Sequence, residues 1–348
     1  YVTMTGRYDA QNPPALRRLI ASILESERGG GHRPVDWLAA DELGRVIQPF
    51  DFHEPTSMTE ALALAQAPGA RLFAGGCELV LAMRRGAVRY QNLVSIMKLP
   101  ELDTFTAHPK IGVEVGAQVR INRLASHIWV GKRWAALHEA IEQLHPPHIL
   151  NMGTLIGNVC AAVNYYDLPT ALFAHRAELR ITDGTATRIV PIEAFYGADR
   201  QTAVQPGEMV ASMFLPPPGP DAGSAFKKIY KARRREGDLH KINAAAYIAL
   251  DPARERILDA TLALGCIGAH PIRIPAAEAA LVGQLADEAV FDAAATQAMA
   301  AVAPMTDAPW VEEIRSEWIR ILARDVLQQA ASRARSRHDP AEDAHLAY

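Results

Sequence analysis

The sequence predicts a fold that mixes helices and strands, in an α+β or α/β arrangement. Strand-like and helix-like segments alternate from about residue 49 onward, two glycine-rich turns interrupt them, and the pattern changes again at residue 257. At 348 residues, with 49% hydrophobic and 22% charged residues, the chain has the composition of a globular protein. Its length leaves room for about two or three domains.

Composition also excludes several classes of function. The net charge of −3 argues against nucleic acid or an anionic membrane as a partner. No apolar run approaches the roughly 20 residues that a membrane helix requires. The N-terminus has no charged-then-apolar signal pattern, so we expect an intracellular, cytoplasmic protein.

The three cysteines are scattered, at Cys77, Cys160 and Cys266, with no C-x-x-C pair. They cannot supply the four thiolates of an iron–sulfur cluster, and zinc-binding spacings are absent. We therefore expect no metal site in this chain. If electrons pass through it, an organic cofactor must carry them.

The N-terminal part divides into an attachment and the start of a compact fold. Residues 1–46 are expected to be a linker or docking arm, with one amphipathic helical pattern over residues 14–27. Hydroxyl groups at Thr56 and Ser57 predict the cap of a helix over residues 59–66. The segments that follow the first glycine turn are predicted strands at 92–97 and 111–117 and predicted helices at 123–129 and 134–144.

The first glycine element is a short apolar run that ends in Gly75 and Gly76 and continues at once into a helical pattern. Glycine can adopt positive φ and lets backbone N–H groups approach a bound group closely. Such a turn before a helix suits an anion such as a phosphate. A plain tight turn is the alternative.

The second glycine element runs from Asn151 to Asn158. Gly153 and Gly157 allow close approach of the backbone, while the side chains of Asn151, Thr154 and Asn158 can reach phosphate or ribose oxygens. Asp167 follows just before an apolar helical pattern. It could accept hydrogen bonds from ribose hydroxyls or serve as a helix cap.

Later segments complete the pattern. Strands are expected at residues 178–182, 188–191, 209–215 and 244–250. Six basic residues between 227 and 235 form either a functional cluster or a solvated loop face. A small C-terminal domain, with a strand pattern over residues 257–266 and helical patterns after it, is expected over residues 257–330, followed by a polar tail over residues 331–348.

Together, the two glycine elements resemble those of the FAD-binding (medium) subunit of the molybdenum hydroxylases, a family that includes xanthine dehydrogenase and carbon monoxide dehydrogenase. The resemblance covers about residues 47–330, and motifs such as Phe195-Tyr196-Gly197 also follow the family pattern. It implies an α+β fold of the vanillyl-alcohol-oxidase/PCMH type with a small α/β C-terminal domain. In this reading, residues 47–220 form two FAD-binding subdomains, and residues 221–256 form a connecting segment that completes the flavin site.

The resemblance also implies the residues that contact FAD. Eight come from the first element, seven from the second, and three lie elsewhere. They are Leu72, Phe73, Ala74, Gly75, Gly76, Cys77, Glu78, Leu79, Asn151, Gly153, Thr154, Leu155, Ile156, Gly157, Asn158, Asp167, Val210 and Lys231. Lys227 or Lys228 could replace Lys231 near the flavin. No catalytic residue is implied.

The implied function is electron transfer. A partner large subunit would carry molybdopterin, a small subunit would carry [2Fe-2S] clusters, and FAD in this chain would pass electrons to NAD+ or another acceptor. The family resemblance further implies a dimer of heterotrimers. Two alternatives remain open: a self-contained FAD-dependent oxidoreductase, and a flavin-free assembly subunit.

Several positions depart from the family pattern. Ile156 replaces a glycine, Val163, Asn164 and Tyr166 replace common Ser, Pro and Ser residues, and Leu150 replaces an arginine. Because a β-branched residue resists positive φ and adds bulk, Ile156 is expected to disturb the phosphate site.

Overall fold

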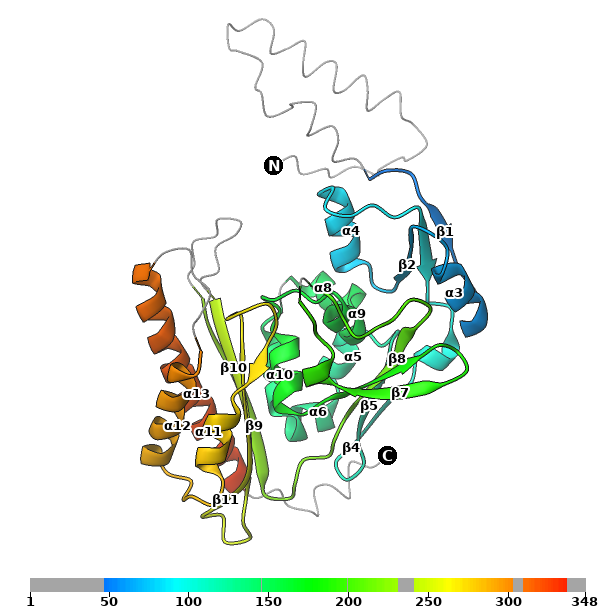
Figure 1. Ribbon diagram of the computed structural model, residues 1–348. Coiled ribbons are helices and arrows are strands. Elements are labelled where there is room, and N and C mark those ends of the chain that lie inside the picture. Colours follow the sequence, from blue (N-terminus) through cyan, green and yellow to red (C-terminus); the bar gives the residue numbers. More distant parts are fainter. Residues whose placement is uncertain (1–46, 145, 199, 231–240, 303–308, 337–348) are drawn as a thin grey trace, which may run out of the picture.

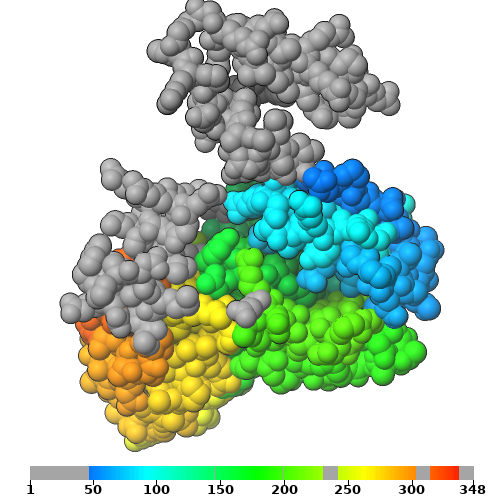
Figure 2. Space-filling view, turned by 45° about the horizontal axis from the view of Figure 1, so that its top comes forward, coloured from blue at the N-terminus to red at the C-terminus, as the bar shows by residue number. Residues whose placement is uncertain are grey.

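Three β-sheets organise the computed structural model, which describes residues 47–144, 146–198, 200–230, 241–302 and 309–336 (Figure 1). A small parallel sheet forms the N-terminal lobe, a five-stranded sheet with helices forms the centre, and a four-stranded sheet forms the C-terminal lobe. In the space-filling view, the blue-to-cyan N-terminal lobe and the yellow-to-orange C-terminal lobe flank the green central part of the chain (Figure 2).

The N-terminal lobe is built around three parallel strands in the order β1-β3-β2. Its elements are β1 (Asp51–His53), α3 (Met58–Ala65), β2 (Ala70–Phe73), α4 (Cys77–Arg84) and β3 (Asn92–Ser95). The predicted cap is confirmed, because Ser57 Oγ accepts a hydrogen bond from Glu60 N at 3.2 Å at the start of α3.

The central part contains an antiparallel sheet in the order β4-β5-β8-β6-β7 and a group of short helices. Its strands are β4 (Phe105–His108), β5 (Gly112–Gly116), β6 (Glu178–Thr182), β7 (Thr187–Pro191) and β8 (Met209–Leu215). Its helices are η2 (Pro100–Leu102), α5 (Ile121–Ala125), α6 (Ile128–Arg133), α7 (Ala135–Glu142), α8 (Pro147–Met152), α9 (Leu155–Cys160), α10 (Leu168–Ala174) and η3 (Ile192–Ala194).

The single helix predicted over residues 123–129 is wrong. The structure has two helices there, α5 and α6, because the chain leaves the helical conformation at His127, whose φ and ψ are −86° and 120°. The apolar spacing continues across this break, since Leu124 and Trp129 are both buried, and a periodicity argument alone does not detect it.

The C-terminal lobe is an antiparallel sheet in the order β12-β11-β10-β9, with helices α11 to α13 on its outer face (Figure 1). Its elements are β9 (Ala222–Tyr230), β10 (Lys241–Leu250), β11 (Ile257–Gly265), β12 (Ile272–Arg273), α11 (Pro275–Leu281), α12 (Glu288–Ala300) and α13 (Pro309–Arg335). The segment 221–256, interpreted from the sequence as a connection, therefore contributes β9 and β10 to the same sheet as β11.

Helix α13 lies directly against β9. A Cβ atom on Gly223 would lie 2.3 Å from the Ala330 carbonyl oxygen, so glycine is needed for this approach. The helix continues through Arg335, past the point where the sequence suggested a polar tail, and Ala331 and Ala334 are buried. Residues 337–348 of that tail lie outside the described residues.

Two hydrophobic cores underlie this arrangement. One joins the N-terminal lobe to the central sheet and helices, and the other lies between the C-terminal sheet and its helices. Phe226, Ala245 and Ala263 of the C-terminal sheet belong to the first core, so apolar packing also joins the two parts. Within the described residues, no helix has both the length and the apolar character needed to cross a bilayer.

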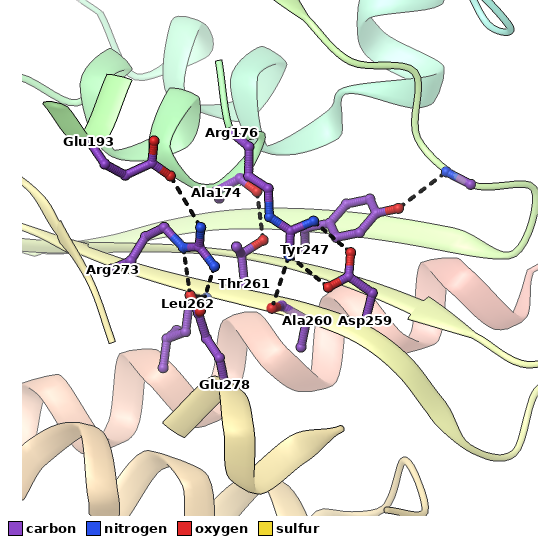
Figure 3. Close-up of polar contacts among 11 residues, drawn as sticks. Ala174, Arg176, Glu193, Tyr247, Asp259, Ala260, Thr261, Leu262, Arg273 and Glu278 are labelled. Carbon is purple, nitrogen blue, oxygen red and sulfur yellow. Dashed lines mark hydrogen bonds and ion pairs between the residues drawn. The ribbon is translucent and has the colours of Figure 1, made fainter. Parts of the chain in front are cut away.

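Ion pairs connect the central part to the C-terminal sheet (Figure 3). Arg176 donates two hydrogen bonds of 2.6 Å to the Asp259 carboxylate, and Arg273 bridges Glu278 at 2.5 Å and Glu193 at 3.2 Å. Because Arg176 and Asp259 are 38% and 42% exposed, we expect this pair to contribute at most about 1 kcal/mol. The pairs therefore orient the sheet more than they stabilise it.

A buried histidine lies beside this interface. His175 follows α10, its ring is 6.4 Å from that of Tyr247, and its Nε2 has no hydrogen-bond partner among the described residues. Burial lowers the pKa of His175 from 6.5 to about 3, because the imidazolium form would be desolvated. The side chain is therefore neutral in the folded protein at neutral pH.

Mild acid should destabilise the fold through His175. The unfolded chain binds this proton below pH 6.5 and the folded chain only below about pH 3, so stability is lost as pH falls through this window. Between pH 6.5 and pH 5 the loss is about 2 kcal/mol. Urea unfolding at pH 7.5 and 5.0 should show a smaller pH effect in His175→Phe than in the unmodified chain. Identical pH effects in both proteins would contradict this assignment.

Candidate functional site

The two glycine elements predicted from the sequence lie in direct contact. Gly75 follows β2, and Met152 and Gly153 connect α8 to α9. A Cβ atom on Gly75 would lie 2.0 Å from the Met152 carbonyl oxygen and 2.9 Å from Gly153 Cα. No side chain can occupy that space, so the contact requires glycine at position 75. The structure thus brings together two segments that are far apart in the sequence.

The second element is held in place by the chain between β5 and α5. Ile121 N donates a 3.0 Å hydrogen bond to the Gly153 carbonyl, and the Arg120 guanidinium donates to the Met152 carbonyl. The carbonyl group that contacts Gly75 therefore has a cationic partner. As a result, the contact between the two elements has a fixed orientation.

The first element turns sharply at Gly76, which has a φ of 71° and precedes α4. A Cβ atom there would also lie 2.6 Å from the ring of Phe73. The N–H groups of Cys77, Glu78 and Leu79 have no hydrogen-bond acceptor among the described residues. They form the first turn of an eight-residue helix, where donors and the helix dipole both favour an anion.

The remaining predicted residues of the first element are all half-buried, from Leu72 to Leu79. Cys77 Sγ lies 3.8 Å from the Gly75 carbonyl oxygen, to which it donates. Burial raises the pKa of the Cys77 thiol, and the nearby Arg120 opposes this shift. The thiol is therefore protonated at neutral pH and acts as a weak donor rather than as a nucleophile.

The second element continues into α9. Thr154 Oγ1 accepts a 3.0 Å hydrogen bond from Gly157 N, and a Cβ atom on Gly157 would lie 2.7 Å from that oxygen. Asn158 Oδ1 is buried and has no partner among the described residues, which leaves hydrogen-bonding capacity for a ligand. Asn151 is exposed, and its amide oxygen accepts from Asn122 at 2.9 Å.

Ile156 does not behave as the sequence suggested. It lies inside α9, it is not among the residues with positive φ, and its side chain is 4% exposed within the main hydrophobic core. The expected conflict between a β-branched residue and a left-handed conformation is therefore absent. Leu155 is also fully buried, and its N–H donates to the Val119 carbonyl at 3.3 Å, so of these two residues only Ile156 could offer a ligand its backbone N–H.

Asp167 lies at the centre of a buried polar network. Its Oδ2 is 3.0 Å from Lys228 Nζ, and its Oδ1 accepts from Asn243 Nδ2 at 2.7 Å. Asn243 Oδ1 in turn accepts from Thr170 Oγ1 at 2.8 Å. A Cβ atom on Gly265 would lie 2.1 Å from the Thr170 hydroxyl, so glycine in β11 makes room for the network.

This network changes the interpretation of Asp167. Although Asp167 precedes α10, its carboxylate makes no capping hydrogen bond, so the helix-cap alternative is not supported. The Asp167 side chain is only 4% exposed. Sequence reasoning missed Asn243, although a polar residue directly before the apolar run 244–250 was a possible signal.

A second polar cluster joins the first element to the segment before α10. Tyr166 Oη donates a 2.7 Å hydrogen bond to Glu78 Oε2, and Arg200 Nη2 lies 3.8 Å from Glu78 Oε1. Burial and the Glu78 carboxylate both raise the pKa of Tyr166, so its hydroxyl stays protonated. Neither Tyr166 nor Arg200 was a candidate site residue from the sequence.

Two predicted residues remain, Val210 and Lys231. Val210 is buried in the main core, in β8 opposite Ile181. Lys231 lies outside the described residues, but Lys228, the substitute suggested by the sequence, reaches Asp167. Among the described residues, no group of three or more His, Cys, Asp or Glu side chains could hold a metal ion.

The groups around the first two elements suit a diphosphate better than a metal or a nucleophilic reaction. The N–H groups at the start of α4, which have no acceptor among the described residues, and the close glycine contact could both face an extended anionic ligand. The Asn158 amide oxygen is an acceptor, so it suits a hydroxyl or N–H group of such a ligand rather than a phosphate oxygen. Asp167 and Lys228 provide buried charge nearby. The arrangement therefore fits a dinucleotide cofactor.

Comparisons with known proteins agree with this fit. Residues 48–218 match the model of the FAD binding domain in molybdopterin dehydrogenase, and residues 225–340 match that of the CO dehydrogenase flavoprotein C-terminal domain. The chain is 27% identical over 289 residues to the carbon monoxide dehydrogenase medium chain of Afipia carboxidovorans, covering 82% of this chain and 98% of that protein. It is also 27% identical over 290 residues to a putative xanthine dehydrogenase FAD-binding subunit of Escherichia coli (strain K12), with the same coverage.

The fold is also similar to chains in solved structures of oxidoreductases. A chain of quinoline 2-oxidoreductase from Pseudomonas putida 86 superimposes with a TM-score of 0.74 at 25% identity, covering 83% of this chain and 99% of that chain. A chain of a Cu,Mo-CO dehydrogenase has the same TM-score, identity and coverage.

Replacing Gly75 with alanine should destabilise the protein by about 1–3 kcal/mol, because the new methyl group would overlap the Met152 carbonyl. Gly131→Ala is the matched control. It lies in α6, where a Cβ atom would be 3.5 Å or more from its neighbours. Urea unfolding should show a loss for Gly75→Ala and none for Gly131→Ala. Equal stability of the two variants would show that the two elements are not in contact.

Proposed function

Because the chain belongs to the family of FAD-binding subunits of the molybdenum hydroxylases, and so is a subunit of an oxidoreductase, we propose that it holds FAD between its two glycine elements and transfers electrons within a multi-subunit complex. The observation that carries this proposal is the contact between Gly75 and the Met152–Gly153 peptide beside the unpaired N–H groups of α4. In this proposal, the contact sets the position of the N–H groups of α4, and the surface they form is called the diphosphate cradle below.

In this proposal, different residues contact different parts of FAD. Backbone groups of residues 75–79 and 154–158 hold the diphosphate, and the Asn158 amide oxygen accepts a hydrogen bond from a hydroxyl or N–H group elsewhere on the cofactor. The region of Asp167 faces a ribose, and Val210 and either Lys228 or Lys231 lie toward the ring system. When bound, FAD supplies reversible one- and two-electron redox chemistry. The chain's own residues bind and orient it.

The rest of the electron path would lie on other subunits. The sequence has three scattered cysteines, too few for an iron–sulfur cluster of its own. We therefore assign the [2Fe-2S] clusters to a small partner subunit and molybdopterin to a large one. NAD+ or another acceptor would take the electrons from FAD, and a dimer of heterotrimers is the proposed assembly.

A flavin-free assembly subunit is the second candidate. Its main support from the sequence was Ile156, which was expected to block the phosphate site. Since the Ile156 side chain is buried in the core, this support is lost. The buried Asp167–Lys228 pair is the observation that still favours this candidate, because both Asp167 oxygens already have protein partners.

Purified protein should contain one FAD per chain. The absorption spectrum should show flavin bands, and chromatography of the released flavin should identify FAD rather than FMN. Absence of flavin even after incubation with excess FAD would reject the proposal and favour the assembly subunit.

Asn158→Ala should weaken FAD binding by about tenfold without loss of stability, since the amide oxygen has no protein partner to lose. Fluorescence titration of the flavin-free protein measures the affinity. Asn92→Ala, in β3, is the control, because its side chain binds His53 instead. Unchanged affinity in Asn158→Ala would remove Asn158 from the site.

Asp167→Ala is a less specific variant. It removes the carboxylate from a buried ion pair, so we expect it to destabilise the fold by about 3–5 kcal/mol.

A further inference from the structure

The Glu78 carboxylate occupies an unusual place for an anion-binding site. It lies in the first turn of α4, next to the N–H groups of Cys77 and Leu79 that would hold the diphosphate. A carboxylate at this position is itself attracted by the helix N-terminus and by free N–H groups. Glu78 is therefore a potential internal competitor for the ligand.

The structure holds this carboxylate away from those donors. One oxygen accepts a 2.7 Å hydrogen bond from Tyr166 Oη, and the other lies 3.8 Å from Arg200 Nη2. None of the backbone N–H groups in the first turn of α4 makes a hydrogen bond to Glu78 in the described structure. Both oxygens are thus directed toward side chains from other parts of the fold.

Tyr166 is well placed to hold the Glu78 carboxylate away from these N–H groups. Its ring packs edge-on against Tyr165 at 5.6 Å, and it directly precedes the buried Asp167 network. The hydroxyl is therefore presented from a fixed segment. Arg200 is 54% exposed, so its ion pair with Glu78 at 3.8 Å is weak on its own. Tyr166 is the stronger of the two restraints.

Resting on the proposed FAD site, we propose that Tyr166, assisted by Arg200, is a positioning residue that withdraws the Glu78 carboxylate from the diphosphate cradle and thereby sets the affinity for FAD. Without the tyrosine hydroxyl, the carboxylate can turn to the N–H groups of its own helix turn. It then competes with the diphosphate for the same donors and repels its charge.

The test is a double-mutant cycle measured by fluorescence titration of flavin-free protein with FAD. Tyr166→Phe should weaken binding about tenfold, and this loss should shrink at high salt because it is electrostatic. Glu78→Gln should bind FAD at least as tightly as the unmodified chain. The double variant Tyr166→Phe/Glu78→Gln should recover to within about twofold of Glu78→Gln alone.

Tyr165→Phe is the matched control, because it removes a neighbouring hydroxyl that does not contact Glu78. A loss in Tyr166→Phe that Glu78→Gln does not rescue would indicate a structural role and overturn the inference. Weaker binding in Glu78→Gln alone would mean that the carboxylate contacts FAD directly, which also overturns it. If the unmodified chain itself binds no FAD, the proposed function fails together with the inference.

Discussion

The approach of Gly75 to the Met152 carbonyl is the constraint on which the candidate site depends. The backbone at Gly75 and the Met152 carbonyl are too close to leave room for a Cβ atom. The loop after β2 and the loop before α9 therefore form one continuous surface. The Arg120 guanidinium binds the same carbonyl, so the contact is also fixed from the central part of the chain. The positive φ of Gly76 then leads the chain directly into the first turn of α4, whose N–H groups have no acceptor among the described residues. The position of the donors thus follows from two adjacent glycines.

A second constraint joins this surface to the C-terminal sheet. The Asp167 carboxylate, from the central part, binds Lys228 of β9 and Asn243 of β10. A buried pair of this kind contributes little net stability, because desolvation offsets most of the attraction. Its effect is on geometry: the strands can dock in only one register if both oxygens are to keep their partners. The partly exposed pairs around Arg176 and Arg273 reinforce the same orientation.

The sequence predicted those parts of the fold and site that depend on local chemistry. Paired glycines before a helix, the Ser57 cap and the alternating apolar strands each express a preference of a few neighbouring residues. The partners Tyr166–Glu78 and Asp167–Lys228 are 88 and 61 residues apart, and no local signal joins them. The break at His127 was missed for a related reason, since apolar spacing persists across it. Ile156 was misjudged because its φ depends on the helix that contains it.

Three of the residues that depart from the family pattern, Val163, Asn164 and Tyr166, have well-defined surroundings in the structure. Considered singly, Val163, Asn164 and Tyr166 suggest a degraded site, because small and rigid residues are replaced by larger ones. In the fold, Val163 is buried, Asn164 donates to the Gly268 carbonyl at 3.3 Å, and Tyr166 binds Glu78. The two polar replacements thus connect this segment to the loop between β11 and β12 on one side and to α4 on the other. Random loss of a site would leave unpaired polar groups, whereas these replacements are paired. The surrounding fold therefore accommodates all three side chains.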